Sequence, residues 1–139
     1  MRILSIDYGK KRTGIAVTDP MQIIANGLET VETKDLETFL TSYMEKEEVE
    51  TIVVGYPMQM DGEDSENMKR IQPFVNRLRK LFPDKKIEMY DERFTSVLAH
   101  KAMLASGIGK KARQNKGLVD KISATIILQE YLERTKNFI

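Results

Sequence analysis

Residues 3–17, which read ILSIDYGKKRTGIAV, decide the fold of this chain. Residues 3–6 are typical of a buried strand, and this strand ends in an acid, Asp7. Residues 9–14 begin and end with glycine and predict a turn, after which residues 15–17 form a second strand. Two strands joined by so short a turn are expected to pair as a hairpin.

The turn itself admits two interpretations. Gly9 and Gly14 either supply turn geometry alone or allow the backbone to approach a phosphate closely. In the second case the positive side chains of the turn would add phosphate contacts. These side chains are Lys10, Lys11 and Arg12. A similar turn occurs in phosphate-binding ATPases of the actin and sugar-kinase kind, so the motif alone is not specific.

The remaining periodicity predicts an α/β protein. Thr33 is expected to cap the first helix, and Pro73 predicts either a kink in the second helix or a start near Gln72. Ser96 and Gly107 are expected to begin and end a short third helix. Further strands are predicted at residues 28–31, 51–55 and 87–90, and helices at 36–44, 68–81, 96–107 and 118–134. The order β-β-β-α-β-α-β-α-α favours a mixed sheet of about five strands flanked by helices.

Composition limits the classes of function. The 139 residues are 41% hydrophobic and 31% charged, which is typical of one globular domain spanning residues 1–139. No signal peptide or membrane-spanning run is visible, so we expect a cytoplasmic protein with no membrane partner. With no cysteine and one histidine, a bound metal should have carboxylate ligands, which favours Mg²⁺ or Mn²⁺.

Charge is distributed unevenly although the net charge is only +1. Residues 107–117 contain four basic side chains and no acid, whereas residues 34–50 contain six acids and two lysines. The four basic residues are Lys110, Lys111, Arg113 and Lys116. This segment is either a solvated surface or a phosphate-binding loop that positions a nucleic acid without reading its sequence.

Three acids are candidates for a shared site. Asp7 ends the first strand, Glu92 follows the last strand, and Asp120 lies in the first turn of the last helix. Strand ends in α/β sheets are where ligands bind, so Asp7 and Glu92 are expected at one edge. Each acid alone has an ordinary alternative, as a loop-capping or solvated carboxylate. Clustered carboxylates instead require a cation, as in nucleases that use two metal ions.

Asp120 is the most informative of the three acids. At helical spacing it shares a stripe with Ala124, Ile127 and Tyr131, which should face the sheet. A carboxylate buried there is costly unless it is paired or holds a metal. The alternative is that Asp120 only stabilises the helix N-terminus, by roughly 0.3–1 kcal/mol.

Four motifs together resemble the YqgF family, also called RuvX, whose members are described as Holliday junction resolvases and as pre-16S rRNA nucleases. The resemblance covers nearly the whole chain. The motifs are IDYGKKRTGIAVTD at 6–19, VVGYP at 53–57 with MDG at 60–62, DERFTS at 91–96, and VDK at 119–121 followed by Ala124 and ILQ at 127–129. Tyr56 replaces a more usual leucine, and Pro73 stands where family members carry ordinary helix formers.

The resemblance implies a ribonuclease-H-like fold similar to RuvC, with Asp7, Glu92 and Asp120 as catalytic acids and metal ligands. It also implies a cytoplasmic role in maturing the 5′ end of pre-16S rRNA, with ribosomal precursor particles as candidate partners. Whether Asp91 or Glu92 faces the metal is left open, as is the oligomeric state. Nucleic-acid contacts are expected from Lys10, Lys11, Arg12, Arg93, Lys110, Lys111, Arg113 and Lys116.

The expected function is therefore a metal-dependent nuclease acting on structured nucleic acid. Holliday junction resolution on branched DNA is the first alternative. A non-catalytic nucleic-acid-binding module is the second, although binding phosphate would not favour a negative cluster. An actin-like ATPase is disfavoured because that fold places two such domains around its nucleotide.

Overall fold

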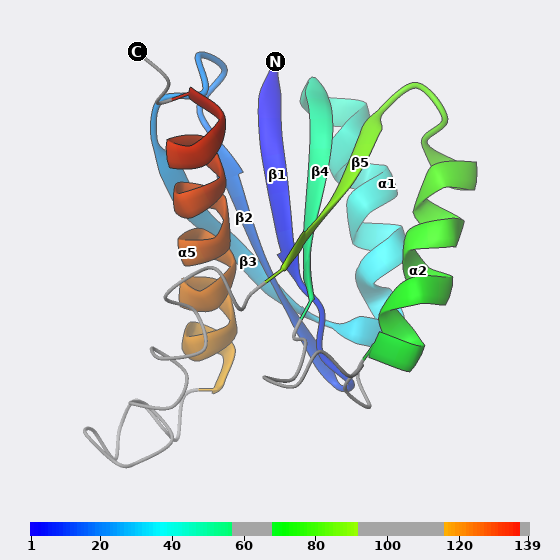
Figure 1. Cartoon of the computed structure of the whole chain (residues 1–139). Coiled ribbons are helices and arrows are strands. Elements are labelled where there is room, and N and C mark those ends of the chain that lie inside the picture. Colours follow the sequence, from blue (N-terminus) through cyan, green and yellow to red (C-terminus); the bar gives the residue numbers. More distant parts are fainter. Residues whose placement is uncertain (57–67, 92–115, 137–139) are drawn as a thin grey trace.

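The computed structural model describes residues 1–56, 68–91 and 116–136, which form one mixed sheet with helices on both faces (Figure 1). The strands are β1 (Arg2–Asp7), β2 (Arg12–Thr18), β3 (Ala25–Glu32), β4 (Val49–Tyr56) and β5 (Lys86–Asp91). The helices are the 3₁₀ turn η1 (Thr33–Asp35), α1 (Leu36–Lys46), α2 (Met68–Leu81) and α5 (Lys116–Lys136). Among these residues, no helix is long and apolar enough to cross a membrane.

The strand order is β3-β2-β1-β4-β5. The pairs β1–β2 and β2–β3 are antiparallel, whereas β1–β4 and β4–β5 are parallel. The mixed five-stranded sheet and the β1–β2 hairpin predicted from the sequence are therefore confirmed. Because β1, β4 and β5 run the same way, their carboxyl ends meet at one edge, where ligands bind in α/β sheets.

Alternating side chains of the strands build two separate cores. On one face, Leu4 and Ile6 of β1 pack with Leu40 of α1 and Leu78 of α2. On the other face, Ile3, Ala16 and Val53 pack with the buried side of α5. Figure 1 shows the same layering for the described helices, with α1 and α2 on one side of the sheet and α5 on the other. Period-two alternation thus assigns each residue of β1 to one of the two faces.

Small residues on the sheet allow α5 to approach closely. Ala16 and Ser5 are fully buried beneath this helix, and a Cβ added to Gly27 would lie 2.8 Å from Cγ of Lys121. The buried side of α5 includes Ala124, Ile127 and Tyr131, as the helical stripe predicted. Short side chains on both partners explain why one helix covers β1, β2 and β3 together.

One local prediction is wrong. Thr33 does not cap α1, because residues 33–35 form η1 and Asp35 is the N-cap. The Thr33 hydroxyl instead donates a hydrogen bond to the Gly9 carbonyl at 2.6 Å. The helix predicted at residues 68–81 is confirmed as α2, and because it begins at Met68, Pro73 lies inside it and the alternative start near Gln72 does not apply. The short helix predicted at residues 96–107 lies outside the described residues.

Candidate nucleic-acid cleavage site

Asp7 lies at the carboxyl end of β1, where β1 meets β2 and β4. It pairs in register with Gly14 of β2 and Gly55 of β4. The residue is only 7% exposed, although it is acidic. Ser5, two residues earlier, faces α5, so strand alternation puts Asp7 on the α5 face as well.

The packing of α5 brings Asp120 to the same place. Ser5 Oγ donates a hydrogen bond to the Ala124 carbonyl at 2.7 Å, which fixes α5 against β1. The helix runs antiparallel to β1 (Figure 1). Asp120 lies one turn before Ala124 in α5, and Asp7 lies two residues after Ser5 in β1. One helical turn and two strand residues each advance about 6 Å, so the two acids end at the same level.

Gly14 accounts for how closely the helix approaches at this level. A Cβ added to Gly14 would lie 1.9 Å from the carbonyl oxygen of Asp120, closer than any real contact. The backbone of Asp120 therefore rests directly on the strand that pairs with Asp7. Gly55, on the other side of Asp7, also lacks a side chain. Because both residues paired with Asp7 are glycines, neither places a side chain beside its carboxylate.

Arg12 balances the charge of Asp120. Its Nε lies 3.1 Å from Oδ2 of Asp120, and the two side chains are 38% and 23% exposed. Arg12 shares a face of β2 with Gly14, which points it toward α5. Arg12 is one of the phosphate contacts predicted from the sequence. The structure adds that this guanidinium also pairs with one of the predicted metal ligands.

The third predicted acid, Glu92, lies outside the described residues. Among the described residues no group of three metal-ligating side chains is found, so the predicted triad is neither confirmed nor contradicted. Asp91, the residue before Glu92, pairs with Tyr56 of β4. Tyr56 packs on the core formed with α1 and α2. Asp91 thus belongs to the face opposite α5. The described side chains also exclude five predicted phosphate contacts, namely Arg93, Lys110, Lys111, Arg113 and Lys116.

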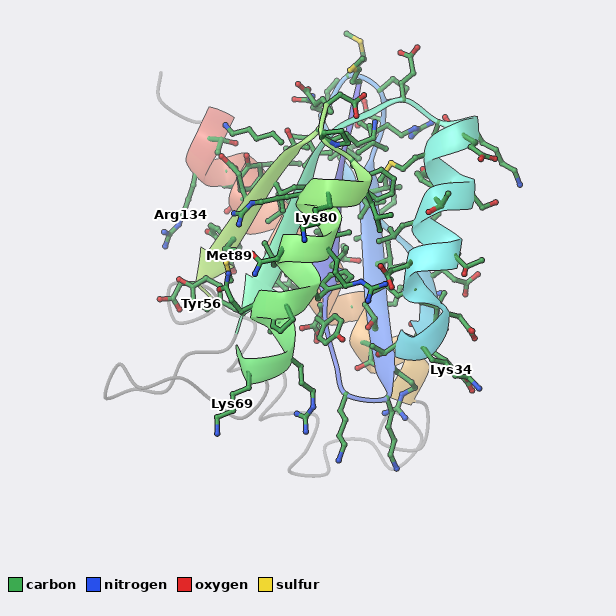
Figure 2. All side chains as sticks on the ribbon, turned by 90° about the vertical axis from the view of Figure 1, so that its right-hand side faces the viewer. Lys34, Tyr56, Lys69, Lys80, Met89 and Arg134 are labelled. Atoms are coloured by element: carbon green, nitrogen blue, oxygen red, sulfur yellow. The ribbon has the colours of Figure 1, made fainter. Side chains whose placement is uncertain are left out.

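Positive side chains surround this edge of the sheet. A surface cavity of about 440 Å³ is lined by Lys10, Lys11, Arg12, Glu32 and Lys34. Figure 2 shows Lys34 and Lys69 at one end of the molecule, on η1 and at the start of α2. Lys34, Lys69 and Arg70, which lie near this edge, are not among the contacts predicted from the sequence. The available signal was topological, since the helices after β3 and β4 begin at the edge where β1 ends.

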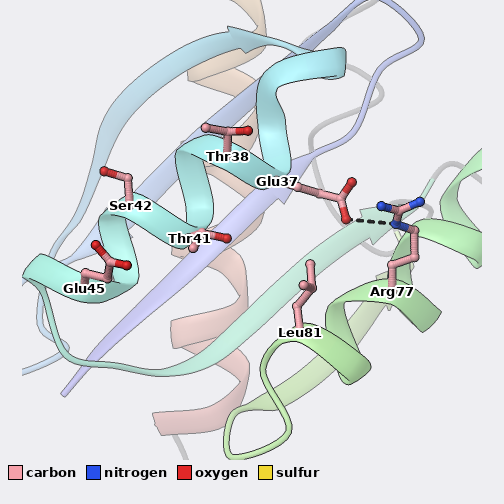
Figure 3. Close-up of a pocket in the computed structure, with 7 residues that line it drawn as sticks. All are labelled: Glu37, Thr38, Thr41, Ser42, Glu45, Arg77 and Leu81. Carbon is pink, nitrogen blue, oxygen red and sulfur yellow. Dashed lines mark hydrogen bonds and ion pairs between the residues drawn. The ribbon is translucent and has the colours of Figure 1, made fainter.

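A second hollow lies between α1 and α2. It measures about 490 Å³ and is lined by Glu37, Thr38, Thr41, Ser42, Glu45, Arg77 and Leu81 (Figure 3). Arg77 Nε donates to Glu37 Oε1 at 2.8 Å and ties the two helices together. The lining contains two carboxylates and one guanidinium that is already paired, so this hollow is poorly suited to a polyanion.

Residues 1–134 match the family model described as "RuvX: Holliday junction resolvase". The chain belongs to this family. A relative from Phocaeicola vulgatus named "Putative pre-16S rRNA nuclease" is 67% identical over 135 residues, covering 97% of both chains. Relatives with the same name from Flavobacterium johnsoniae and Porphyromonas gingivalis are 59% and 53% identical, over 94% and 95% of this chain and 95% and 96% of their own.

Solved structures share the fold at low sequence identity. Thermus thermophilus RuvC, solved in complex with a Holliday junction substrate, has a TM-score of 0.60 at 16% identity, over 96% of this chain and 95% of its own. Fowlpox virus resolvase, solved with Holliday junction DNA, has a TM-score of 0.59 at 13% identity, over 98% and 99%. The expected ribonuclease-H-like fold is confirmed.

Proposed function

We propose that this chain is a one-domain nuclease that hydrolyses phosphodiester bonds in structured nucleic acid and processes the 5′ end of pre-16S rRNA. Membership of the RuvX family supports nuclease activity. The shared name of the similar relatives favours the ribosomal RNA precursor as substrate. Cytoplasmic location and association with ribosomal precursor particles stay predictions from the resemblance.

The observation that supports the proposal most is the placement of Asp7. The residue is 7% exposed at the carboxyl edge of the sheet, and α5 brings Asp120 to the same face. Burying a carboxylate is costly without a compensating positive charge. Arg12 Nε lies 3.1 Å from Oδ2 of Asp120, so this acid has a positive neighbour. Two carboxylates brought to one face at the carboxyl edge of the sheet favour a cation at this position.

The donor set fits a hard divalent cation. Asp7 and Asp120 offer oxygen ligands, and the chain contains no cysteine and a single histidine. Such ligands suit Mg²⁺ or Mn²⁺. Asp7, Asp120 and the predicted Glu92 would hold the metal, which when bound supplies a Lewis acid for phosphodiester hydrolysis.

The chain's cations would bind and orient the substrate. Lys10 and Lys11, in the turn after Asp7, line the cavity of about 440 Å³ and would contact phosphates of the substrate. Arg12 would exchange Asp120 for a phosphate oxygen once the acid is otherwise neutralised. Further phosphate contacts stay predictions for the cations of residues 93–116. They are Arg93, Lys110, Lys111, Arg113 and Lys116.

Asp7→Asn tests the nuclease directly. The amide keeps the size of the side chain but removes its charge, so we expect turnover to fall about 100-fold or more. Nucleic-acid binding should be kept or strengthened, because a negative charge is lost. Asp84→Asn is the matched control, since Asp84 is exposed in the turn before β5. Equal cleavage by both variants, on precursor RNA and branched DNA with either metal, would overturn the proposal.

Branched DNA is the second candidate substrate because the family model is described as a Holliday junction resolvase. A Holliday junction has two-fold symmetry, so its resolvase is expected to be a dimer. Solution mass, combined with cleavage-site mapping on both substrates, separates the two. A monomer that cuts only precursor RNA supports rRNA processing, and a dimer that cuts junctions symmetrically supports resolution. A binding module would show neither cut.

A further inference from the structure

A small cavity lies on the other face of the sheet, directly beside the candidate site. It measures about 190 Å³ and is bounded by Tyr8, Leu36, Pro73 and Phe74, with Arg70 and Arg77 among its polar lining residues. Tyr8 follows Asp7 in the chain, and its ring packs on the α1 and α2 core. Alternation along the chain therefore puts the carboxylate of Asp7 on one face and the ring of Tyr8 on the other.

The lining of this cavity combines aromatic rings with two arginines and one glutamate, Glu37, which is paired with Arg77. The ring centroids of Tyr8 and Phe74 are 4.7 Å apart, with an angle of 31° between the planes. Burial raises the pKa of the Tyr8 phenol, and the guanidinium of Arg70 lies near enough to oppose that rise. The hydroxyl of Thr33 lines the same cavity and donates to the Gly9 carbonyl, which ties it to the loop after Asp7.

We propose that this cavity binds one unpaired base of the nucleic-acid substrate, next to the phosphodiester held at Asp7. The inference rests on the proposed nuclease function and adds a requirement for an unpaired nucleotide. Aromatic rings and arginine planes are the usual partners of splayed-out bases. The volume is below the roughly 300–1,000 Å³ of sites for drug-sized ligands, so it suits a single base rather than a helix.

Charge around the cavity sets the path of the substrate backbone. Lys69 and Arg70 lie in the first turn of α2, at the end of the molecule where Lys34 also lies (Figure 2). Glu37 and Arg77, whose ion pair is drawn in Figure 3, line both this cavity and the hollow between α1 and α2. That hollow adds Glu45, which would repel phosphates. The strand should therefore enter past Lys69 and Arg70 and end at the ion pair.

The test measures binding without divalent metal, so that no cleavage occurs. Two RNA hairpins differ only in that one carries a single bulged 2-aminopurine, whose fluorescence falls when the base stacks on a ring. We expect the wild type to bind the bulged hairpin about 5-fold or more tightly than the fully paired one, and to quench it. Tyr8→Leu should lose both effects, whereas Tyr8→Phe should keep them because the ring remains.

Arg70→Ala should weaken binding of the bulged hairpin, and Thr41→Ala, in the neighbouring hollow, should not. Urea unfolding of each variant verifies that it is folded. Equal wild-type affinity for the two hairpins, or equal quenching by Tyr8→Leu and Tyr8→Phe, would overturn the assignment of the cavity. Cleavage by a protein that shows no such preference removes this inference alone. If the protein binds the bulged hairpin but never cleaves nucleic acid, the result counts against the proposed nuclease function and not against the base-binding cavity.

Discussion

Replacing Gly14 with alanine should separate the two acids of the candidate site. The new Cβ would lie 1.9 Å from the carbonyl oxygen and 2.3 Å from the carbonyl carbon of Asp120. Ordinary contacts begin at 3.4 Å, so the helix would have to move by about 1.5 Å. The obstructing atoms are backbone, which cannot rotate away as a side chain can. Overpacking of this kind costs about 1–3 kcal/mol, and we expect the upper end of that range.

Gly27→Ala is the matched control, because Gly27 also lies on a strand covered by α5. Its added Cβ would lie 2.8 Å from Cγ of Lys121 and 3.2 Å from Oγ1 of Thr125. Both obstructing atoms are in side chains, and that of Lys121 is long and flexible. We therefore expect this variant to lose at most about 1 kcal/mol of unfolding free energy. The two variants thus add the same methyl group, which meets backbone atoms at Gly14 and side-chain atoms at Gly27.

Urea unfolding followed by circular dichroism measures both variants. Gly14→Ala should also lose nuclease turnover, by about tenfold or more, at temperatures where it is fully folded, since α5 carries Asp120 away from Asp7. Gly27→Ala should retain turnover. Unfolding free energies that agree within about 0.5 kcal/mol for the two variants would refute the reasoning, and so would full activity of folded Gly14→Ala.

Ser5→Ala removes a buried 2.7 Å hydrogen bond to α5 and should cost about 1 kcal/mol in urea unfolding; no loss would show that this bond does not hold the helix. Burial acts to raise the pKa of Glu88, but hydrogen bonds from Lys86 and Tyr131 hold that pKa below its ordinary value. The charged carboxylate therefore stabilises the fold above the unfolded pKa of about 4.3, and this stabilisation is lost as the pH falls through the folded pKa. Tyr131→Phe should therefore lower the melting temperature more at pH 7 than at pH 3, and an equal loss at both would contradict this linkage. Arg12→Ala should raise the affinity for Mn²⁺ up to about fivefold, because the side chain that pairs with Asp120 is removed. Calorimetric titration measures this affinity, and weaker metal binding would show that Arg12 does not compete with the metal for Asp120.

Local patterns predicted most of the fold. The largely apolar run of residues 3–6 identified β1 as a buried strand, and the spacing of Asp120, Ala124, Ile127 and Tyr131 identified the buried side of α5. Thr33 shows where local reasoning fails. Threonine favours helix N-caps, but here its hydroxyl contacts the carbonyl of Gly9, which is 24 residues away. No nearby sequence signal reports such a contact.

The candidate site depended more on tertiary structure. The sequence indicated that Asp7 ends a strand, but its pairing between Gly14 and Gly55 follows from the strand order. Arg12 and Asp120 are 108 residues apart, and they meet only because α5 packs antiparallel on β1. The role assigned to Glu92 stays a prediction.

The antiparallel packing of α5 on β1 also determines how the protein can be attached to other objects. Strand β1 begins, and α5 ends, at one end of the sheet, whereas Asp7 and the first turn of α5 lie at the other (Figure 1). The six residues of β1 separate these ends by about 20 Å. A fluorophore, a surface tether or a fused protein attached at the start of β1 or the end of α5 would therefore leave the candidate site pointing outward.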